Sequence, residues 1–469
     1  MSQGDQSGGV QGRAPIGSVL EPVKGSVPVG KGKEDPSKLV RTPKGLEHED
    51  PSPLYVVWEI TLACDLGCRH CGSRAGDARS TEMSTEACLA AVEEMKELGV
   101  REVTLIGGEA YLRDDWSQIA RAITDAGMLC GITTGGQGFT QERVDEAVDA
   151  GIGSISVSID GLERTHDAQR GKKGSFRMAR EACERIARSP MRLATNTQIN
   201  KLSMPELPAL ADLLVEMGSK AWQLQLTVPM GNAADRPDML LQPYELLELF
   251  PLLVWIKETK ITPNGIAFFP GNNIGYFGPY EEHLRYGGTK GAHWAGCGAG
   301  KWCLGVEADG KIKGCPSLSS EDYTGGYFGE TPLMDVVENS HEVNHLRKRT
   351  RDDLWGFCRT CYYGDVCKAG CSWTSDVFFD RTGNNPYCIH RAIEHEKKGL
   401  RERFRRVMGA PGRPFDNGVF ELFTEPIPEV ADTNDPTIAG VPLSEIQALT
   451  TSDKGIWEMD RIRKALTAT

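Results

Sequence analysis

The segment 64–71, with the sequence CDLGCRHC, decides how the rest of the chain is interpreted. It places three thiols at Cys64, Cys68 and Cys71, directly after the apolar run 54–60. An apolar run of this length, followed by turn-forming residues, predicts a β-strand that ends in a cysteine-bearing loop. Three thiolates hold three irons of a four-iron cluster and leave the fourth iron open to another ligand. The segment therefore predicts a metal site with one free coordination position.

Composition and charge exclude several classes of protein. The 469 residues are 39% hydrophobic and 25% charged, which is typical of a soluble globular protein with two domains and tails. The net charge of −12 argues against a general nucleic-acid-binding protein, because such a protein needs a basic surface. No apolar run reaches the ~18 residues of a membrane span, and residues 1–20 lack a secretory signal. We therefore expect a cytoplasmic protein with no membrane partner, preceded by a disordered extension over 1–50 that is rich in Gly, Pro and Ser.

Fourteen cysteines point to metal rather than to disulfides, because a reducing cytoplasm keeps thiols free. Eleven of them fall into groups with short spacings. The other three, Cys88, Cys130 and Cys183, stand alone inside predicted helices or strands. We expect these three to be buried, small and apolar.

Strand and helix patterns alternate from Tyr55 onward. The strand candidates are Tyr55–Thr61, Glu102–Ile106, Leu129–Thr133, Ser154–Ile159, Leu193–Ile199 and Ala221–Leu226. Helix start signals lie between them at Ser84, Thr140 and Pro205. The units repeat at roughly 30 residues, as strand–helix units with parallel strands do. The pattern predicts an α/β fold with a parallel sheet and leaves open whether that sheet is doubly wound or a partial barrel.

Further along the chain, a Leu-rich amphipathic helix is predicted over 236–260 and a charged helix up to about 408. A Pro-rich tail from Gly409 is expected to wrap around the protein or hang free, with a short helix near Trp457–Leu466.

Loops with unusual composition follow the first four predicted strands. They contain the three cysteines, then Gly107-Gly108-Glu109, then 133–136, and then Asp160-Gly161. Because the carboxyl ends of parallel strands lie at one edge of a sheet, we expect these loops to lie together and to form the ligand site.

These motifs together resemble those of the radical S-adenosylmethionine (SAM) superfamily. The resemblance implies a partial (β/α)6 barrel over 51–265, in which a [4Fe-4S] cluster on Cys64, Cys68 and Cys71 binds SAM through its open iron and cleaves it to a 5′-deoxyadenosyl radical. It also implies that Gly107, Gly108 and Glu109 contact the SAM amino group, and that Ser158 and Asp160 face its ribose and carboxylate. The alternatives are that Gly-Gly-Glu is only a turn, and that Ser158 and Asp160 cap the next helix. His70 is expected to pack against the cluster or shield it.

The later cysteines resemble those of the SPASM domain, here 297–408, which follows a linker over 266–296 and precedes the tail 409–469. The resemblance implies two auxiliary [4Fe-4S] clusters. The first is carried by Cys297, Cys303, Cys315 and Cys371, and the second by Cys358, Cys361, Cys367 and Cys388. Because the two ligand sets interlace along the chain, this region is expected to need metal in order to fold. A pair of zinc knuckles is the alternative, since four thiolates suit either metal.

Most radical SAM enzymes that carry a SPASM domain act on a ribosomally made peptide or protein, and this sequence resembles that maturase group. The resemblance implies an enzyme that abstracts hydrogen from a ribosomally made precursor peptide, giving a cross-link or another oxidative modification. It also implies a flavodoxin or ferredoxin-type reductant. Residues 1–50 lack the apolar core of a leader-binding domain, so we expect a separate leader-binding protein or recognition by the SPASM face. The segment Pro270–Tyr280 either lines the substrate site or forms a core strand with a turn.

Two other functions remain open at this point. One is a radical SAM oxidase or epimerase of a small molecule. The other is a non-catalytic iron–sulfur electron carrier, which would gain nothing from an open iron.

Overall fold

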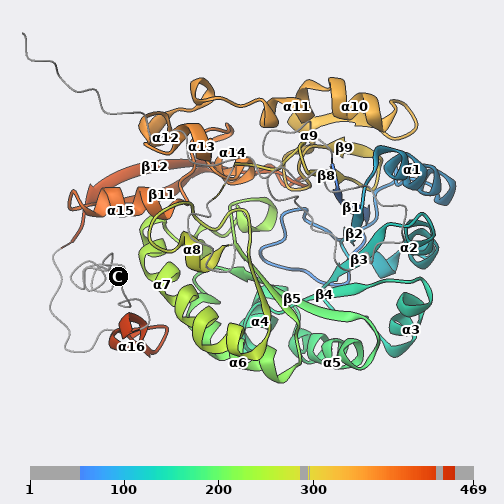
Figure 1. Cartoon of the computed structure of the whole chain (residues 1–469), viewed down its shortest axis with the longest axis horizontal. Helices are drawn as coiled ribbons and strands as arrows, with labels where there is room; N and C mark the ends of the chain where they lie inside the picture. The colour runs from blue at the N-terminus through green and yellow to red at the C-terminus, as the bar shows by residue number, and fades with distance from the viewer. Residues whose placement is uncertain (1–52, 286–293, 295, 429–436, 449–469) are drawn as a thin grey trace, which may run out of the picture. The chain divides into compact units, whose positions relative to one another are not determined.

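The computed structural model describes residues 53–285, 294, 296–428 and 437–448. Its central feature is a ten-stranded sheet with the order β10-β9-β8-β1-β2-β3-β4-β5-β6-β7 (Figure 1). The strands are β1 Tyr55–Thr61, β2 Glu102–Gly107, β3 Leu129–Thr134, β4 Ser154–Ser158, β5 Arg192–Ile199, β6 Ala221–Leu226, β7 Ala267–Pro270, β8 Cys303–Val306, β9 Lys311–Lys313 and β10 Thr324–Tyr327. The α/β fold with a parallel sheet is thus confirmed, and each of the six predicted strands is present to within one residue at either end.

The strand order decides between the two sheet types that the sequence left open. Strands β1 to β7 are parallel and are hydrogen-bonded in the order in which they follow one another along the chain. Right-handed crossovers, which are the rule between neighbouring parallel strands, place crossover helices on one face of the sheet, and this is the arrangement of a barrel wall. Figure 1 shows helices α1, α2, α3, α5 and α6 on the outer side of the strands.

Six α-helices lie between β1 and β6. They are α1 Thr85–Leu98, α2 Trp116–Asp125, α3 Gln141–Asp149, α4 Glu163–Arg170, α5 Ser175–Arg188 and α6 Leu207–Glu216. The predicted start signals at Ser84 and Thr140 are confirmed, because each side chain accepts a hydrogen bond from a backbone amide in the first turn of its helix. Pro205 lies in the 3-10 turn Met204–Glu206, directly before α6.

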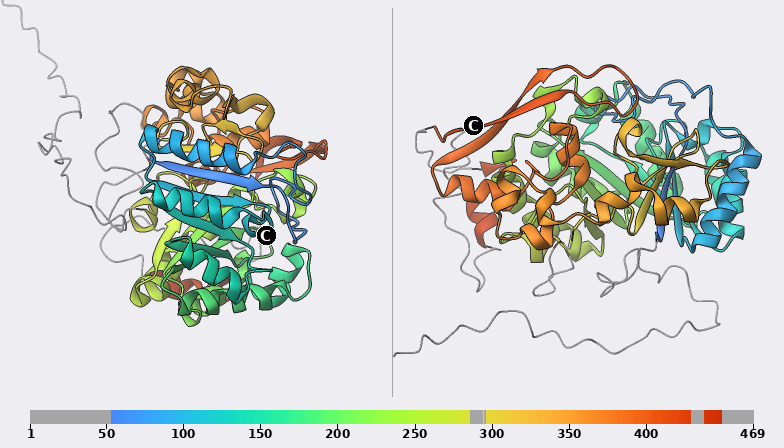
Figure 2. Two further views of the ribbon diagram at one scale, coloured as in Figure 1. Left: turned by 90° about the vertical axis from the view of Figure 1, so that its right-hand side faces the viewer. Right: turned by 90° about the horizontal axis from the view of Figure 1, so that it is seen from above.

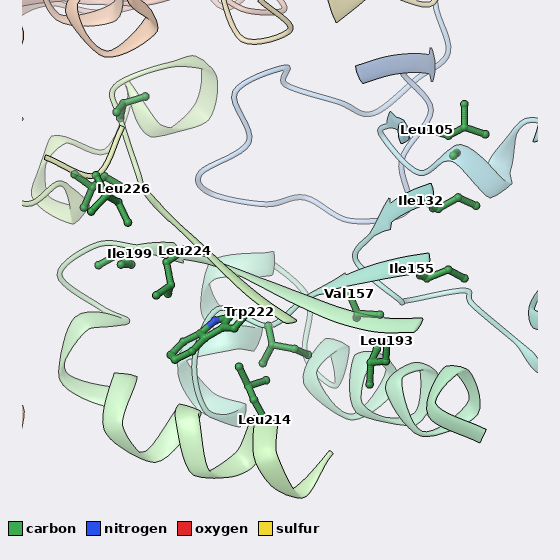
Figure 3. Close-up of a cluster of buried hydrophobic side chains, with 14 of the residues drawn as sticks. Leu105, Ile132, Ile155, Val157, Leu193, Ile199, Leu214, Trp222, Leu224 and Leu226 are labelled. Atoms are coloured by element: carbon green, nitrogen blue, oxygen red, sulfur yellow. The ribbon is translucent and has the colours of Figure 1, made fainter. Parts of the chain in front are cut away.

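The core of this domain is a row of apolar side chains that crosses the sheet. Leu105, Ile132, Ile155 and Leu193 lie opposite one another in successive strands, and none is more than 2% exposed (Figure 3). Their burial between sheet and helices supplies the main stabilising term of such a fold. The isolated cysteines Cys88, Cys130 and Cys183 are buried in α1, β3 and α5, as predicted.

The predicted Leu-rich helix is broken into shorter pieces. Pro237–Met239 and Pro243–Glu245 are 3-10 turns, α7 covers Leu246–Ile256, and a π-helical turn covers Lys257–Ile261. Proline favours the first turn of a helix and interrupts its interior. This accounts for the two 3-10 turns, each of which begins at a proline. The stretch Pro237–Asn264 is long and apolar enough for a membrane span, but 78% of its apolar window is buried inside the protein, as in a core helix.

The prediction of a charged helix up to about residue 408 is wrong. Helix α15 covers Ile389–Glu396, and Gly399 then adopts a left-handed conformation with φ 70°. Residues Leu400–Met408 form strand β11, which pairs antiparallel with β12, Val419–Pro426 (Figure 2). Glu402 and Phe404 are buried, whereas Arg405 is exposed, so the period is that of a strand. The tail after Gly409 is therefore not free over this range but returns as half of a hairpin.

The remaining elements are short. They are α8 Glu281–Leu284, α9 Ser320–Tyr323, α10 Leu333–Asn339, α11 His341–Arg347, α12 Gly356–Thr360, α13 Gly364–Cys367, α14 Ser372–Phe379, β13 Thr437–Ile438, β14 Val441–Pro442 and α16 Leu443–Ala448. The predicted disordered extension over 1–50 and the predicted helix near Trp457–Leu466 lie outside the described residues.

Candidate active site

The loop between β1 and α1 carries the first three cysteines and closes on itself. The amide of Cys64 donates to the carbonyl oxygen of Gly76 at 2.8 Å, and the amide of Gly76 donates to that of Leu62 at 3.1 Å. Cys68 is buried, and Cys64 and Cys71 are partly buried. Figure 1 shows this loop, in blue, on the inner side of the sheet. The three thiols thus lie on one closed loop at the carboxyl end of the first strand.

The loop after β2 packs directly against the cysteine loop, and this contact requires glycine. A Cβ atom on Gly107 would lie 2.3 Å from the carbonyl oxygen of Thr61. One on Gly108 would lie 2.1 Å from the carbonyl oxygen of Ala63 and 2.7 Å from the Cβ of Cys64. Both distances are shorter than a real Cβ contact. The two glycines are therefore needed for close packing of protein on protein, whatever they do for a ligand.

Glu109 is the charged group that this packing places beside the cysteines. Its carboxylate accepts hydrogen bonds from the Thr134 hydroxyl and the Gly135 amide, each at 2.6 Å, and it is only 2% exposed. The Glu109 carboxylate, the Cys64 sulfur and the Asp65 carboxylate lie within 4.8 Å of one another. Burial raises the pKa of Glu109 to about 7. A buried carboxylate in this position is suited to bind a cationic group, such as an amine, next to the thiols.

Asp160 is fully buried beyond the end of β4, where it anchors the cysteine loop from another side. Its Oδ2 lies 2.6 Å from the Arg170 guanidinium and 3.2 Å from His70 Nε2. Burial alone raises the pKa of Asp160, but Arg170 and His70 outweigh it and hold that pKa well below its usual range. His70, which precedes Cys71, is thus a partner of Asp160, and its packing against a cluster stays a prediction. Ser158, 8% exposed, ends β4 at the same edge, and the SAM contacts of Ser158 and Asp160 stay predictions.

Arg170 is a site residue that the sequence did not reveal. It ends α4, is buried, and donates to the sulfur of Cys68 at 3.6 Å. Burial raises the pKa of the Cys68 thiol to about 11, although Arg170 opposes this rise. Burial likewise raises the pKa of Cys64 to about 12. A raised pKa favours the neutral thiol, and a metal that binds here displaces the proton to give the thiolate, so the donor set is compatible with a metal cluster.

Asn232 and Asp416, which were also missed, hold the loop through its backbone and through the Arg74 side chain, respectively. The side-chain amide of Asn232 donates to the carbonyl oxygen of Cys68 at 2.8 Å, and its backbone amide donates to that of Cys71 at 2.9 Å. Arg74 donates to the Asp416 carboxylate at 2.7 Å. Asn232 follows β6 and Asp416 precedes β12, so no local spacing links either of them to the cysteines.

The eight later cysteines separate into two groups in space. The first thiol group consists of Cys297, Cys303, Cys315 and Cys371, because Cys315 interacts electrostatically with the other three. The second thiol group consists of Cys358, Cys361, Cys367 and Cys388, because Cys367 interacts with the other three. These groups are the two predicted ligand sets, and the four cysteines of the second group also line one pocket. Burial raises the pKa of Cys315 and Cys367 well above the usual range. Four such thiols suit iron–sulfur or zinc, so the metal itself stays a prediction.

The segment Pro270–Tyr280 forms core and turn rather than an open substrate wall. Asn273 is 2% exposed and Tyr276 is fully buried, and Tyr276 and Phe277 line the pocket of the second thiol group. Phe269, just before the segment, is 54% exposed. The interpretation as a substrate-lining segment is therefore wrong for Asn273, Tyr276 and Phe277, because their side chains fill space beside the cysteines.

Comparisons with known proteins agree with this geometry. Residues 58–214 match the family described as the radical SAM superfamily. The AdoMet-dependent heme synthase of Methanosarcina barkeri is 29% identical over 358 residues, which cover 72% of this chain and 97% of that protein. The mycofactocin maturase MftC of Mycolicibacterium smegmatis is 28% identical over 360 residues, which cover 74% and 86%.

A solved structure shares the fold. Streptococcus suis SuiB bound to S-adenosylmethionine aligns with a TM-score of 0.57 at 17% identity, over 72% of this chain and 76% of that chain. The family match falls on the domain that carries the cysteine loop, and the structural likeness extends beyond it. The chain therefore contains a radical SAM domain over residues 58–214 and, beyond that domain, is similar to the maturase MftC and to SuiB, with a cysteine-rich region towards its C-terminus.

Proposed function

We propose that this protein is a radical SAM maturase that abstracts hydrogen from a ribosomally made precursor peptide and leaves a cross-link or another oxidative modification. The observation that carries the proposal is the approach of the Glu109 carboxylate to the Cys64 thiol. This proximity supports the proposal that Glu109 binds the SAM amino group beside the thiols that would hold the cluster. When bound, a [4Fe-4S] cluster supplies the electron that cleaves SAM to a 5′-deoxyadenosyl radical.

The chain's own residues would bind, orient and shield. Cys64, Cys68 and Cys71 would ligate three irons, and Glu109 would bind the SAM ammonium. Arg170 would stabilise the Cys68 thiolate by a charge-assisted hydrogen bond. Ser158 at the end of β4 would contact the SAM ribose. The buried Asp160, held by Arg170 and His70, would keep the loop in one conformation.

The two later thiol groups would hold auxiliary [4Fe-4S] clusters. Each group offers four thiols and no open position, which suits electron transfer or structure rather than substrate binding. An electron from the product radical would leave through these clusters to a flavodoxin or ferredoxin-type partner. Zinc in either group is the competing assignment.

The substrate class has a second candidate. Mycofactocin maturase is a relative over most of the chain, which supports a maturase, and the recognition of the peptide would rest on the SPASM region or a separate leader-binding protein. The match to the heme synthase of M. barkeri covers 97% of that protein at 29% identity. This match favours a porphyrin as the substrate. We place the peptide first because the SPASM-type cysteine region is the feature shared with the maturase group.

Anaerobic reconstitution tests the proposal. The purified chain is loaded with iron and sulfide, reduced with dithionite and incubated with SAM, and 5′-deoxyadenosine is measured by chromatography. We expect about twelve irons per chain, from three four-iron clusters, and SAM cleavage that is lost when Cys64 is replaced by Ala. Zinc in the later groups, or the absence of 5′-deoxyadenosine, would contradict the proposal.

The same assay distinguishes the substrates. One arm receives any short peptide that is found encoded beside the gene, and the other receives an iron porphyrin. A mass change in the peptide together with faster SAM cleavage supports the maturase. The same response to the porphyrin alone supports a heme synthase-like enzyme and rules out the first choice.

A further inference from the structure

Tyr276 lies between the two thiol groups and contacts one cysteine of each. Its hydroxyl accepts a hydrogen bond from the backbone amide of Cys371, of the first group, at 2.7 Å and donates to the carbonyl oxygen of Asn272 at 2.6 Å. Its own carbonyl oxygen lies 3.6 Å from the sulfur of Cys388, of the second group. The side chain is fully buried. A single residue thus joins ligand positions that belong to different groups.

Gly370, Trp294 and Asn385 pack against Tyr276 and hold it in this position. Gly370, with φ 63°, lies so close that a Cβ atom there would be 2.1 Å from the tyrosine ring. The ring of Trp294 packs against it with centroids 5.2 Å apart. The side-chain amide of Asn385 donates to both the Tyr276 hydroxyl, at 3.4 Å, and the Cys371 carbonyl oxygen, at 3.3 Å. Such close packing leaves the hydroxyl one orientation.

We propose that Tyr276 is a positioning residue that links the two auxiliary clusters and sets the reduction potential of the first. This inference rests on the proposed function, because it requires both clusters. Hydrogen bonds to the sulfurs are among the factors that set the potential of such a cluster. The tyrosine hydroxyl engages the Cys371 amide and so keeps that donor away from sulfur. Loss of the hydroxyl frees the amide to donate to a cluster sulfur, which stabilises the reduced form and raises the potential.

Replacement of Tyr276 by Phe tests this link, because it removes the hydroxyl and keeps the ring. Tyr387→Phe is the matched control. Tyr387 is also fully buried and adjoins Cys388, but its hydroxyl donates to the carbonyl oxygen of Leu241 at 2.6 Å rather than to a cysteine. Both variants are made in a chain whose Cys64, Cys68 and Cys71 are replaced by Ala, so that only the auxiliary clusters remain. Iron content and potentiometric titration followed by EPR are measured.

We expect Tyr276→Phe to raise the midpoint potential of one auxiliary cluster and leave the other unchanged, whereas Tyr387→Phe changes neither. Should Tyr276→Phe fail to fold, 3-fluorotyrosine at position 276 keeps the ring and the hydroxyl but makes that hydroxyl a weaker acceptor for the Cys371 amide, and a smaller rise of the same single potential is expected. Unchanged potentials in the folded variant overturn the inference and leave the proposed function standing. A parent chain without two auxiliary four-iron clusters overturns both.

Discussion

The Arg170 guanidinium donates to the Cys68 sulfur at 3.6 Å, from the far end of the helix that follows β4. The same guanidinium pairs with the buried Asp160. One cation therefore serves a thiol on the first loop and a carboxylate after the fourth strand. It couples the cysteine loop to the middle of the sheet.

Replacement of Arg170 by Met should destabilise this edge of the sheet. Asp160 would lose its guanidinium partner and keep His70 and the backbone amide of Gln198, and breaking a buried ion pair on one side costs about 3–5 kcal/mol. Arg180→Met is the control, because Arg180 is 40% exposed and its pairs with Glu184 and Glu216 are worth about 0–1 kcal/mol. Thermal unfolding and iron content measure the effect. A loss of stability no larger than that of the control would show that the pair is not structural.

Replacement of Gly108 by Ala should displace the cysteine loop. The new methyl group would lie 2.1 Å from the Ala63 carbonyl oxygen, so the backbone of one loop must move. We expect SAM cleavage to fall at least about tenfold, since an error near 1 Å in placement costs about a hundredfold in rate. Gly153→Ala is the control, because nothing lies within 4 Å of a Cβ atom there. Equal 5′-deoxyadenosine formation by both variants would refute the packing argument.

The stability of the protein should fall as pH rises through the range set by Glu59. This β1 carboxyl has its pKa raised to about 7, mainly by burial, with a further contribution from Glu307 and an opposing one from Arg79. The folded state therefore binds the proton more tightly than the unfolded state does, whose pKa is the ordinary 4.5. Stability from this group is present below pH 4.5 and is lost as pH rises to about 7, by at most about 3 kcal/mol.

Glu59→Gln removes the titrating carboxyl and should flatten the dependence of stability on pH. Denaturant unfolding at pH 5 and pH 8 measures the free energy of unfolding of both proteins. Glu93→Gln is the control, since Glu93 is exposed and pairs only with Lys96 at the surface. An identical pH profile in parent and Glu59→Gln would mean that Glu59 is already ionised at pH 5.

The local features of the fold could be predicted from the sequence because their causes are local. Strand β1 has the predicted limits, and Ser84 and Thr140 cap their helices, since hydrophobic runs and capping residues act within a few positions. The prediction failed after α15, where charged residues suggested a helix. The helix ends at Glu396, Gly399 turns the chain in a left-handed conformation, and the alternation of Glu402 and Phe404 with exposed Arg405 is the period that a strand requires.

The support around the site could not be predicted, because its contacts cross the whole chain. Arg170 is 102 residues from Cys68, and Tyr276 is 95 residues from Cys371. Neither residue carries a spacing motif, and a buried arginine or tyrosine looks like any other in a single sequence. The cysteines were recognisable because the ligands of one metal site often follow one another at short, regular spacings.

Replacement of Cys358 by Ala tests whether the second thiol group takes part in turnover. Its burial beside Cys361, Cys367 and Cys388 predicts the loss of one cluster, or about four irons per chain. Cys88→Ala is the control, because Cys88 is buried in α1 and belongs to neither thiol group. This variant should keep all of the iron. If electrons leave through the auxiliary clusters, Cys358→Ala still cleaves SAM but forms little modified peptide, since the product radical cannot be oxidised. Iron loss with unchanged product would make the second cluster structural and would route the electron elsewhere.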